Sequence, residues 1–401
     1  MRILMLNYEF PPIGGGGATS TFNLTRNVVR LGHEVDVVTM GYRGAAVDEV
    51  LDGVHVYRVP CFRLRKEVCH TREMLTYVAS GLIGAGRLAR RRSYDVNNTH
   101  FIFPTGPIGY GLRRLAGLPL ILTARGSDVP GHNPNRFRLD HNLLYPVWRR
   151  IVRKADAMSA VSNDLRRKIH RLVPEVPVTV IPNGVSPIGE AAAPSGSPVA
   201  PAERTRRILV VTRLHEFKGV QYLLEAVTQH RLNYEIEIVG DGPYRRALER
   251  QAATLGGKVR FWGWLDRSES ELRDLYRRCG IFVFPSDREG APAALLEAMS
   301  EGLAVVAANS AGAPEVVGEA GLLVNPRDPA DIARALAELA AAPGAIAEYG
   351  QRARERVAGH FSWDSLAQRY VGLYREVLAA RDGAVSEPIA SEAARVGYHE
   401  A

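Results

Sequence analysis

The fold is decided by one stretch of the sequence, Ile281-Phe-Val-Phe284-Pro-Ser-Asp-Arg-Glu289-Gly-Ala-Pro-Ala-Ala-Leu-Leu-Glu297-Ala-Met-Ser-Glu-Gly302. It begins with a short run in which every residue is apolar, as expected of a strand that is buried on both faces of a sheet. A turn that contains Pro and Gly follows, and then a helical pattern. A buried strand that leads through a turn into a helix is the building block of parallel α/β sheets.

The same alternation extends in both directions from this stretch. Further strands are predicted at Ile3–Leu6, Val35–Met40, Val54–Val59, Leu120–Thr123, Met158–Val161, Ile208–Val211, Ile236–Val239 and Val259–Trp262. Helices are predicted at Thr19–Leu31, Val68–Arg92, Gln221–Gln229, Tyr244–Leu255 and Ser268–Arg278. The chain is therefore predicted to be an α/β protein with two doubly wound, Rossmann-like parallel sheets.

The composition changes abruptly between the two sets of elements. Residues 187–204 are rich in Pro, Ser, Gly and Ala and form a predicted linker between an N-terminal domain, 1–186, and a C-terminal domain, 205–362. A helix at about 363–381 has apolar residues at helical spacing, and we expect it to cross back and complete the N-terminal domain. Residues 382–401 lack such a pattern and are treated as a tail.

The cysteines and the apolar segments restrict the cellular location. Cys61, Cys69 and Cys279 are an odd number, and their spacing fits neither a disulfide framework nor a metal site. This usage favours a reducing compartment. The N-terminal apolar run is too short for a signal peptide, and no window has the roughly 18 apolar residues that a membrane-spanning helix needs. We expect a cytoplasmic protein, with the cytoplasmic face of a membrane as a second hypothesis.

The positive charge is concentrated in the N-terminal half. Residues 1–190 hold 26 Lys and Arg against 15 Asp and Glu, a surplus of 11, whereas the rest holds 25 against 28. The cations cluster at Arg63, Arg65 and Lys66, at Arg87 with Arg90 to Arg92, and at Arg149, Arg150, Arg153 and Lys154. Such runs most often form solvated helix faces, and the sharper hypothesis is contact with anionic lipid or a phosphate-bearing acceptor. Nucleic acid is not an expected partner, because no recognisable nucleic-acid module accompanies the charge.

Three turns have the composition of anion or nucleotide sites. Gly14-Gly-Gly-Gly17 follows the first strand and precedes a helix whose amides and dipole hold an anion well. Arg213 and Lys218 lie where a helix begins after the first strand of the second domain, an arrangement that suits a diphosphate. Gly240-Asp-Gly242-Pro forms another strand-to-helix turn. The alternatives are a flexible turn at 14–17 and a surface turn around Arg213 and Lys218.

Two of the three glutamates in the opening stretch are candidates for binding hydroxyl groups. Glu289 precedes the predicted helix, Glu297 lies on it, and Pro292 suits its first turn. Burying Glu297 within an apolar helix face would be costly without a partner, and sugar or ribose hydroxyls supply hydrogen bonds to a carboxylate. The alternative is an exposed helical Glu.

Taken in order, these motifs resemble the retaining glycosyltransferases of the GT-B fold, family 4. The resemblance spans nearly the whole chain, and its parts are the glycine loop at 14–17, Val180-Ile-Pro-Asn183-Gly184-Val185, Arg213 with Lys218, Gly240-Asp-Gly-Pro243, Phe284-Pro-Ser286, the pair Glu289 and Glu297, and Gly312-Ala-Pro-Glu315-Val-Val. It implies two Rossmann-like domains that face each other across a cleft. It also implies that no metal or other cofactor is bound.

The resemblance assigns roles on the donor side. Arg213 and Lys218 would neutralise the donor diphosphate, Glu297 would bind the ribose, and Glu289 would hold hydroxyls of the transferred sugar. The other donor contacts that it implies are Gly15, Gly16, Gly240, Gly242, Gly290, Ala291, Pro292, Ala293 and Leu296.

The acceptor side departs from the family pattern at Thr123-Ala-Arg125-Gly-Ser-Asp128, because many members carry a His where Arg125 stands. A guanidinium stays protonated and cannot act as a general base, but it binds phosphate or another anion well. His100 and Asp128 are further candidates for a catalytic or acceptor-orienting role, although His100 also fits a hydrogen-bonded His at a strand end. In a retaining front-face mechanism, a donor phosphate oxygen can take the acceptor proton.

The sequence therefore predicts a retaining, metal-independent hexosyltransferase. Its donor would be a UDP- or GDP-sugar, and its acceptor a glycan, a lipid-linked sugar or a small molecule. Two alternatives remain open, since fold does not fix function. They are a nucleotide-sugar epimerase of the same fold and a non-catalytic nucleotide-sugar-binding subunit.

Overall fold

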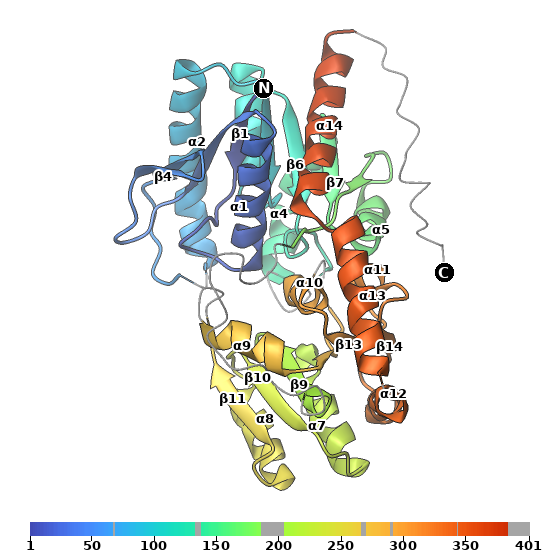
Figure 1. Ribbon diagram of the computed structural model, residues 1–401. Helices are drawn as coiled ribbons and strands as arrows, with labels where there is room; N and C mark the ends of the chain where they lie inside the picture. The colour runs from blue at the N-terminus through green and yellow to red at the C-terminus, as the bar shows by residue number, and fades with distance from the viewer. Residues whose placement is uncertain are drawn as a thin grey trace. The chain divides into compact units, whose positions relative to one another are not determined.

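The computed structural model describes residues 1–66, 69–132, 138–185, 204–265, 270–288, 292–342 and 344–383, without the side chains of 138–142. The chain forms two compact units. Unit 1 contains Met1–Asn183 and Trp363–Ala401, and unit 2 contains Gly184–Ser362. Each unit is a parallel sheet covered by helices (Figure 1), so the predicted α/β class with two parallel sheets is confirmed. The predicted linker up to residue 203 and the predicted tail from residue 384 lie outside the described residues.

Unit 1 is built on an eight-stranded sheet in the order β3-β4-β2-β1-β5-β6-β7-β8. The strands are β1 (Arg2–Leu6), β2 (Glu34–Met40), β3 (Asp48–Leu51), β4 (Val54–Val59), β5 (Val96–His100), β6 (Leu120–Ala124), β7 (Ala157–Ala160) and β8 (Thr179–Val180). All neighbours are parallel except β3 and β4. The strand order reverses between β1 and β5, and the crevice at such a switch point is where doubly wound sheets bind ligands.

Helices cover both faces of this sheet. They are α1 (Gly16–Arg30), α2 (Thr71–Arg91), α3 (Gly106–Ala116), α4 (Arg138–Arg153), α5 (Asn163–Leu172) and α14 (Trp363–Arg381). Helices α1 and α14 pack together over one face, where they share a core with β1, β2 and β4 (Figure 1). Helices α2 and α3 cover the other face. The last described helix of the chain is therefore part of the first unit.

Unit 2 has a six-stranded parallel sheet in the order β11-β10-β9-β12-β13-β14. The strands are β9 (Arg207–Val211), β10 (Glu235–Val239), β11 (Val259–Gly263), β12 (Ile281–Phe284), β13 (Ala304–Ala308) and β14 (Leu322–Val324). The helices are α7 (Val220–Gln229), α8 (Arg245–Ala252), α9 (Ser270–Arg278), α10 (Ala293–Ser300), α11 (Ala313–Val317), α12 (Pro329–Ala341) and α13 (Ala345–His360), with short 3₁₀ turns η1 (Glu216–Lys218) and η2 (Ala253–Leu255). Its switch point lies between β9 and β12.

Two differences between the prediction and the structure concern buried polar residues. The strand β5 was not predicted, because its sequence Val-Asn-Asn-Thr-His is mostly polar although all five residues are buried. Arg63 was assigned to a basic surface cluster, but its side chain is buried and forms an ion pair with Glu9 (3.5 Å). Its guanidinium also donates to the backbone oxygens of Arg65 and Lys66, which offsets the cost of burying the charge.

Within the described part of the chain, no helix is both long enough and apolar enough to cross a bilayer.

Candidate active site

The switch point of unit 2 carries the two predicted donor cations. Arg213 follows β9 and is exposed, while Lys218 ends η1 with only 5% of its surface accessible. Gly219 lies next, at φ 74°, with its Cα so close to the loop after β12 that a Cβ would meet the backbone oxygen of Pro285 at 2.2 Å. The loops after β9 and β12 are thus locked together, and they fix Lys218 at the carboxyl edge of the sheet.

Lys218 differs from an exposed lysine in its pKa. Its pKa is lowered to about 7, mainly by burial and then by the positive charge of Arg213, with Asp287 opposing the shift. A dianionic ligand at this point would return the lysine to its charged form, because an opposite charge favours protonation. The pair of Arg213 and Lys218 is therefore suited to a diphosphate.

Glu297 is the predicted ribose ligand, and it lies on α10 with 6% of its surface exposed. The hydroxyl of Tyr276, on α9, lies 3.1 Å from its Oε2 and donates a hydrogen bond. The alternative of an exposed helical Glu is excluded. Pro292 caps α10 rather than forming its first turn, Ala293 opens the helix, and Leu296 packs into the core of unit 2.

Glu289, Gly290 and Ala291, which the sequence also placed at the donor site, lie outside the described residues.

Gly240 and Gly242, which follow β10, are required by the close packing of the backbone around them. Gly240 has φ 129°, and a Cβ there would lie 1.8 Å from the backbone oxygen of Thr212. A Cβ on Gly242 would lie 2.3 Å from the backbone oxygen of Leu214. Their close packing against the loop that carries Arg213 explains both glycines without a ligand. Their donor-binding role stays a prediction.

In unit 1, the glycine loop leads into α1 at the switch point between β1 and β5. Gly15 caps α1 and has open space beside its Cα, whereas Gly16 is the first residue of the helix. A Cβ on Gly17 would meet the ring of Phe101 at 2.7 Å, in the loop that follows β5. The loop therefore packs against a neighbouring strand end and leaves Gly15 accessible.

The predicted acceptor residues His100 and Arg125 contact each other at the same edge of the sheet. His100 Nδ1 lies 2.8 Å from Arg125 Nη2 and 3.2 Å from Nε. His100 Nε2 lies 2.8 Å from Asn98 Oδ1. Asn98 uses its Nδ2 as donor to the backbone oxygen of Ile121 and to Thr123, so its Oδ1 is the acceptor. His100 therefore carries its proton on Nε2, and Nδ1 accepts from the guanidinium.

This arrangement makes His100 a poor general base. Burial and the charge of Arg125 hold the pKa of His100 well below its ordinary value, and its basic nitrogen is already occupied. The guanidinium of Arg125 is held by His100, by Asn183 Oδ1 and by Thr21 Oγ1, all of them neutral. Among the residues that the structure describes, no carboxylate forms an ion pair with Arg125, and burial lowers the pKa of Arg125.

Asp128 organises the backbone of this edge. Its carboxylate accepts from the backbone N–H groups of Ile102, Arg125 and Gly126 at 2.8 to 2.9 Å. Burial raises the pKa of Asp128, and these hydrogen bonds oppose the rise. Asp128 thus joins the loop after β5 to the turn after β6, which positions Arg125.

The structure adds a residue that the sequence identified only as part of an apolar stripe. Tyr374 on α14 is buried, and its hydroxyl donates to Asn98 Oδ1 at 3.0 Å. Asn98 therefore accepts from Tyr374 and from His100 at once. The only hint in the sequence was the pair Asn97-Asn98 two residues before His100, because polar side chains between two predicted strands need hydrogen-bond partners.

Comparison with known proteins decides the family. Residues 14–187 match the family model described as Glycosyltransferase Family 4, and residues 205–342 match the model described as Glycosyl transferases group 1. The chain belongs to glycosyltransferase family 4. The two models together cover most of the enzyme, one for each predicted domain.

Individual relatives agree with this assignment. The enzyme is 28% identical over 396 residues to an uncharacterized glycosyltransferase of Methanocaldococcus jannaschii, with 94% of this chain and 98% of the relative covered. It is 28% identical over 408 residues to glycogen synthase of Mycobacterium tuberculosis, with 96% of each chain covered.

Solved structures show the same fold. Sucrose-phosphate synthase from Thermosynechococcus elongatus matches with a TM-score of 0.80 and 22% identity, covering 95% of this glycosyltransferase and all of that chain. HepE of Anabaena, solved with UDP-glucose, matches with a TM-score of 0.70 and 18% identity over 94% of this chain and all of that one. The two parallel-sheet units therefore have the GT-B type of fold that the sequence predicted.

Proposed function

We infer that this glycosyltransferase moves a hexosyl unit from a UDP- or GDP-sugar to an acceptor with retention of the anomeric configuration and without a divalent metal. The observation that carries the proposal is the placement of Arg213 and the buried Lys218 at the switch point of unit 2, with Glu297 buried in the same unit. The solved complex of HepE with UDP-glucose supports a nucleotide-sugar donor.

The proposed donor chemistry rests on charge. The nucleoside diphosphate gains negative charge as the glycosidic bond breaks, so Arg213 and a protonated Lys218 stabilise the transition state more than the ground state. These cations take the part that a divalent ion plays in metal-dependent transferases. Glu297 accepts hydrogen bonds from the ribose hydroxyls, and Glu289 holds hydroxyls of the transferred sugar.

On the acceptor side, we propose that Arg125 binds an anionic group of the acceptor. Its hydrogen-bond partners His100, Asn183 and Thr21 are neutral, and the charge of Asp128 does not outweigh the effect of burial on its pKa, so an acceptor anion would further stabilise the guanidinium. His100 and Asp128 act as positioning residues, and the acceptor proton passes to a donor phosphate oxygen because His100 Nδ1 is occupied.

The first experiment screens UDP, GDP and ADP by thermal shift in the presence of EDTA and then tests the sugar conjugates of each binder. We expect a selective shift, followed by transfer whose product has the donor's anomeric configuration by proton NMR. An inverted product would overturn the retaining mechanism. A changed sugar still attached to nucleotide would indicate an epimerase, and binding without turnover would indicate a non-catalytic subunit.

Replacing Arg125 with Gln tests the acceptor assignment. We expect the acceptor KM to rise at least about tenfold, because a charge-assisted contact is lost, while donor hydrolysis without acceptor stays the same. Arg125→Lys is the matched variant that keeps the charge and should recover part of the affinity. An unchanged acceptor KM in Arg125→Gln would show that the guanidinium has only a structural role.

A further inference from the structure

One surface of unit 1 combines exposed apolar side chains with cations. Along α2, the outward positions Arg72, Leu75, Ala79, Ile83 and Arg87 follow one another at intervals of three or four residues, and all five are exposed. Residues at this spacing lie on one side of a helix. The outer side of α2 is therefore apolar in its middle and basic at both ends.

The neighbouring helices continue this surface, since α3 contacts both α2 and α4. Leu115 on α3 is 82% exposed, and Leu143 and Val147 on α4 are 79% and 45% exposed. Together with Leu75 and Ile83 they are five of the eleven large hydrophobic residues that are exposed in the described part of the chain, and only one of the eleven, Trp264, lies in unit 2. Exposed apolar side chains concentrated in this way mark an interaction surface.

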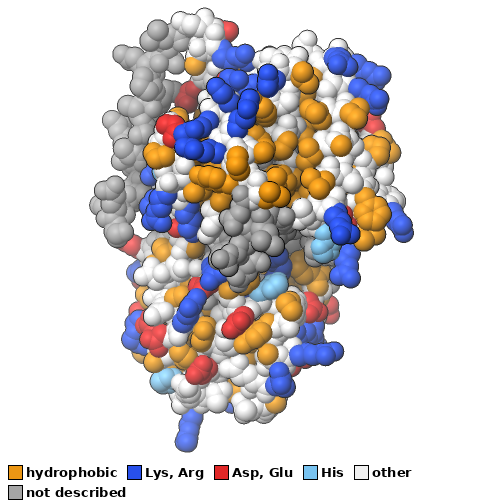
Figure 2. Space-filling view, turned by 180° about the vertical axis from the view of Figure 1, so that it is seen from behind, with side chains coloured by type: hydrophobic (Ala, Val, Ile, Leu, Met, Phe, Trp, Pro, Cys, Tyr) orange, Lys and Arg blue, Asp and Glu red, His pale blue; other side chains and the backbone are white. Residues whose placement is uncertain are grey.

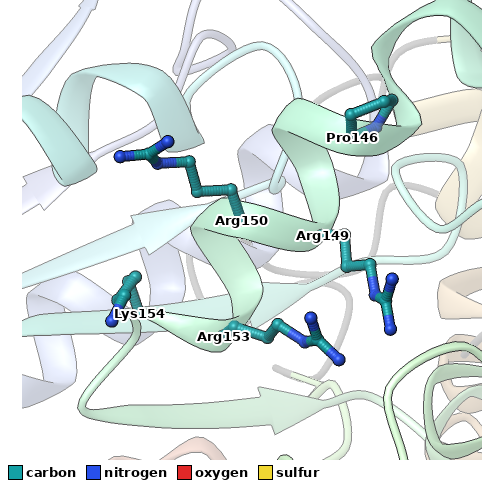
Figure 3. A pocket seen from close by; sticks show the side chains of 5 residues that line it. All are labelled: Pro146, Arg149, Arg150, Arg153 and Lys154. Atoms are coloured by element: carbon teal, nitrogen blue, oxygen red, sulfur yellow. The ribbon is translucent and has the colours of Figure 1, made fainter.

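Cations gather at the C-terminal end of α4. Arg149, Arg150, Arg153 and Lys154 line an open pocket of about 480 Å³ with Pro146. Figure 3 shows Arg149 and Arg153 extending to one side of the helix, and Arg150 and Lys154 to the other.

Among the described residues, these cations contact one acid only, so the pocket keeps a net positive charge. Arg153 forms an ion pair with Glu175, and Arg150 donates to the hydroxyl of Tyr110 on α3. Arg114, also exposed on α3, adds a further cation to this side. No exposed acid lies on α2, α3 or the part of α4 whose side chains the structure describes. In Figure 2, hydrophobic side chains and groups of Lys and Arg share the surface of unit 1.

We propose that the outer surface of α2, α3 and α4 docks unit 1 onto a bilayer that contains anionic phospholipids. Leucine and isoleucine side chains enter the boundary between head groups and acyl chains, while flexible Arg and Lys side chains reach the phosphates around them. Each cation near an anionic surface strengthens binding by about 1 kcal/mol, roughly fivefold.

Other occupants fit this surface less well. A second copy of the chain across a two-fold axis would bring Arg and Lys against Arg and Lys, which is unfavourable. A nucleic acid would use the cations and leave the exposed leucines without a role. The combination of both side-chain types favours a membrane.

The test is co-sedimentation of the full chain with vesicles of phosphatidylcholine alone and of phosphatidylcholine mixed equally with phosphatidylglycerol. We expect the protein to pellet with the mixed vesicles only, and less of it at high salt. The charge variant Arg149→Gln/Lys154→Gln should bind ~20-fold to 30-fold more weakly. The apolar variant Leu115→Gln/Leu143→Gln should bind at least ~tenfold more weakly.

The matched control is Arg246→Gln/Arg250→Gln, which removes two exposed cations from α8 in unit 2 and should leave vesicle binding unchanged. Thermal unfolding confirms that each variant is folded. The proposal is overturned if the wild-type chain does not pellet with the mixed vesicles at low salt. It is equally overturned if the control weakens binding as much as the charge variant, because the cations of α4 would then have no special role. Normal binding by the apolar variant would also overturn it, because the surface would then be a general polyanion site. A dimer that the apolar variant dissociates would assign the surface to a second copy.

Discussion

The proposed binding of the diphosphate depends on pH through the protonation of Lys218. Lys218 has a pKa of about 7 in the free protein, and a bound diphosphate favours its charged form. Nucleotide binding above neutral pH must therefore be accompanied by proton uptake. Between pH 7 and the ordinary lysine value of 10.5, the unfolded chain holds a proton that the folded chain has released. The stability of the free protein therefore rises with pH across this window, whereas diphosphate affinity falls.

We predict that the affinity for the preferred nucleoside diphosphate falls about tenfold or more between about pH 7.5 and pH 9, where the diphosphate itself is fully ionised. Isothermal titration calorimetry in buffers of different ionisation enthalpy measures both the affinity and the proton uptake. Lys218→Met should bind weakly and show little pH dependence in the same window. A wild-type affinity that stays flat with pH would argue against contact between Lys218 and the diphosphate.

At the scale of the elements, a close approach of backbone fixes the loop that carries Arg213. Gly240→Ala would place a Cβ 1.8 Å from the backbone oxygen of Thr212, at a φ of 129° that L residues rarely adopt. We predict a loss of about 3 kcal/mol in the free energy of unfolding, from backbone strain and overpacking together. Denaturant unfolding monitors the change.

Gly256 provides the comparison for Gly240. It also has a positive φ, of 61°, but nothing lies within 4 Å of its added Cβ. Gly256→Ala should cost only about 1 kcal/mol, the price of the left-handed backbone alone. Equal losses in the two variants would mean that the contact with Thr212 adds nothing to the cost of the left-handed backbone conformation.

The hydroxyl of Tyr374 on α14 contacts Asn98, which is linked through His100 to Arg125. Tyr374→Phe removes the hydrogen bond to Asn98 and should lower the free energy of unfolding by about 1 kcal/mol. Because Asn98 also holds His100, which holds Arg125, the acceptor KM should rise as well. Tyr234→Phe is the control, since it removes a buried tyrosine hydroxyl that donates to the backbone oxygen of Leu336 in unit 2. An acceptor KM that is the same in both variants would show that the hydrogen bond from Tyr374 does not affect acceptor binding.

At the scale of the whole molecule, the chain crosses between units twice, and helices from its early and late parts, α1 and α14, share one core. Leu366, Tyr370, Tyr374 and Val377 of α14 are buried with Leu24 and Val28 of α1. We predict that a chain stopping after Ser362 fails to fold unit 1, because about 2 kcal/mol or more is lost for each large buried side chain removed.

A chain that stops after Gly383 keeps α14 and serves as the control. Limited proteolysis followed by mass spectrometry should show cleavage throughout unit 1 in the shorter chain only. The preferred nucleoside diphosphate should still protect unit 2 in both chains, because binding stabilises the folded unit. Protection of unit 1 in the shorter chain would contradict the prediction.

Much of the architecture follows from local pattern. The strands β1 and β12 are almost wholly apolar on both faces, since helices cover both sides of a parallel sheet, and their ends were predicted within a residue. The motif order likewise identified the family. Arg213 and Lys218 are conspicuous in the sequence because they follow a strand end, and Glu297 because it lies within an apolar helical pattern, but their donor-binding roles stay predictions.

Tertiary contacts alone decided the rest. The polar strand β5 is buried because Asn98 and His100 find partners on β6, on the turn after it and on α14, and Tyr374 lies 276 residues from Asn98 in the chain. Arg63 is buried rather than exposed because Glu9, which lies 54 residues away in the chain, compensates its charge. A hydrogen bond or ion pair between distant residues leaves no periodic trace in sequence. Its energy depends on distances of a few ångströms that exist only after the chain has folded.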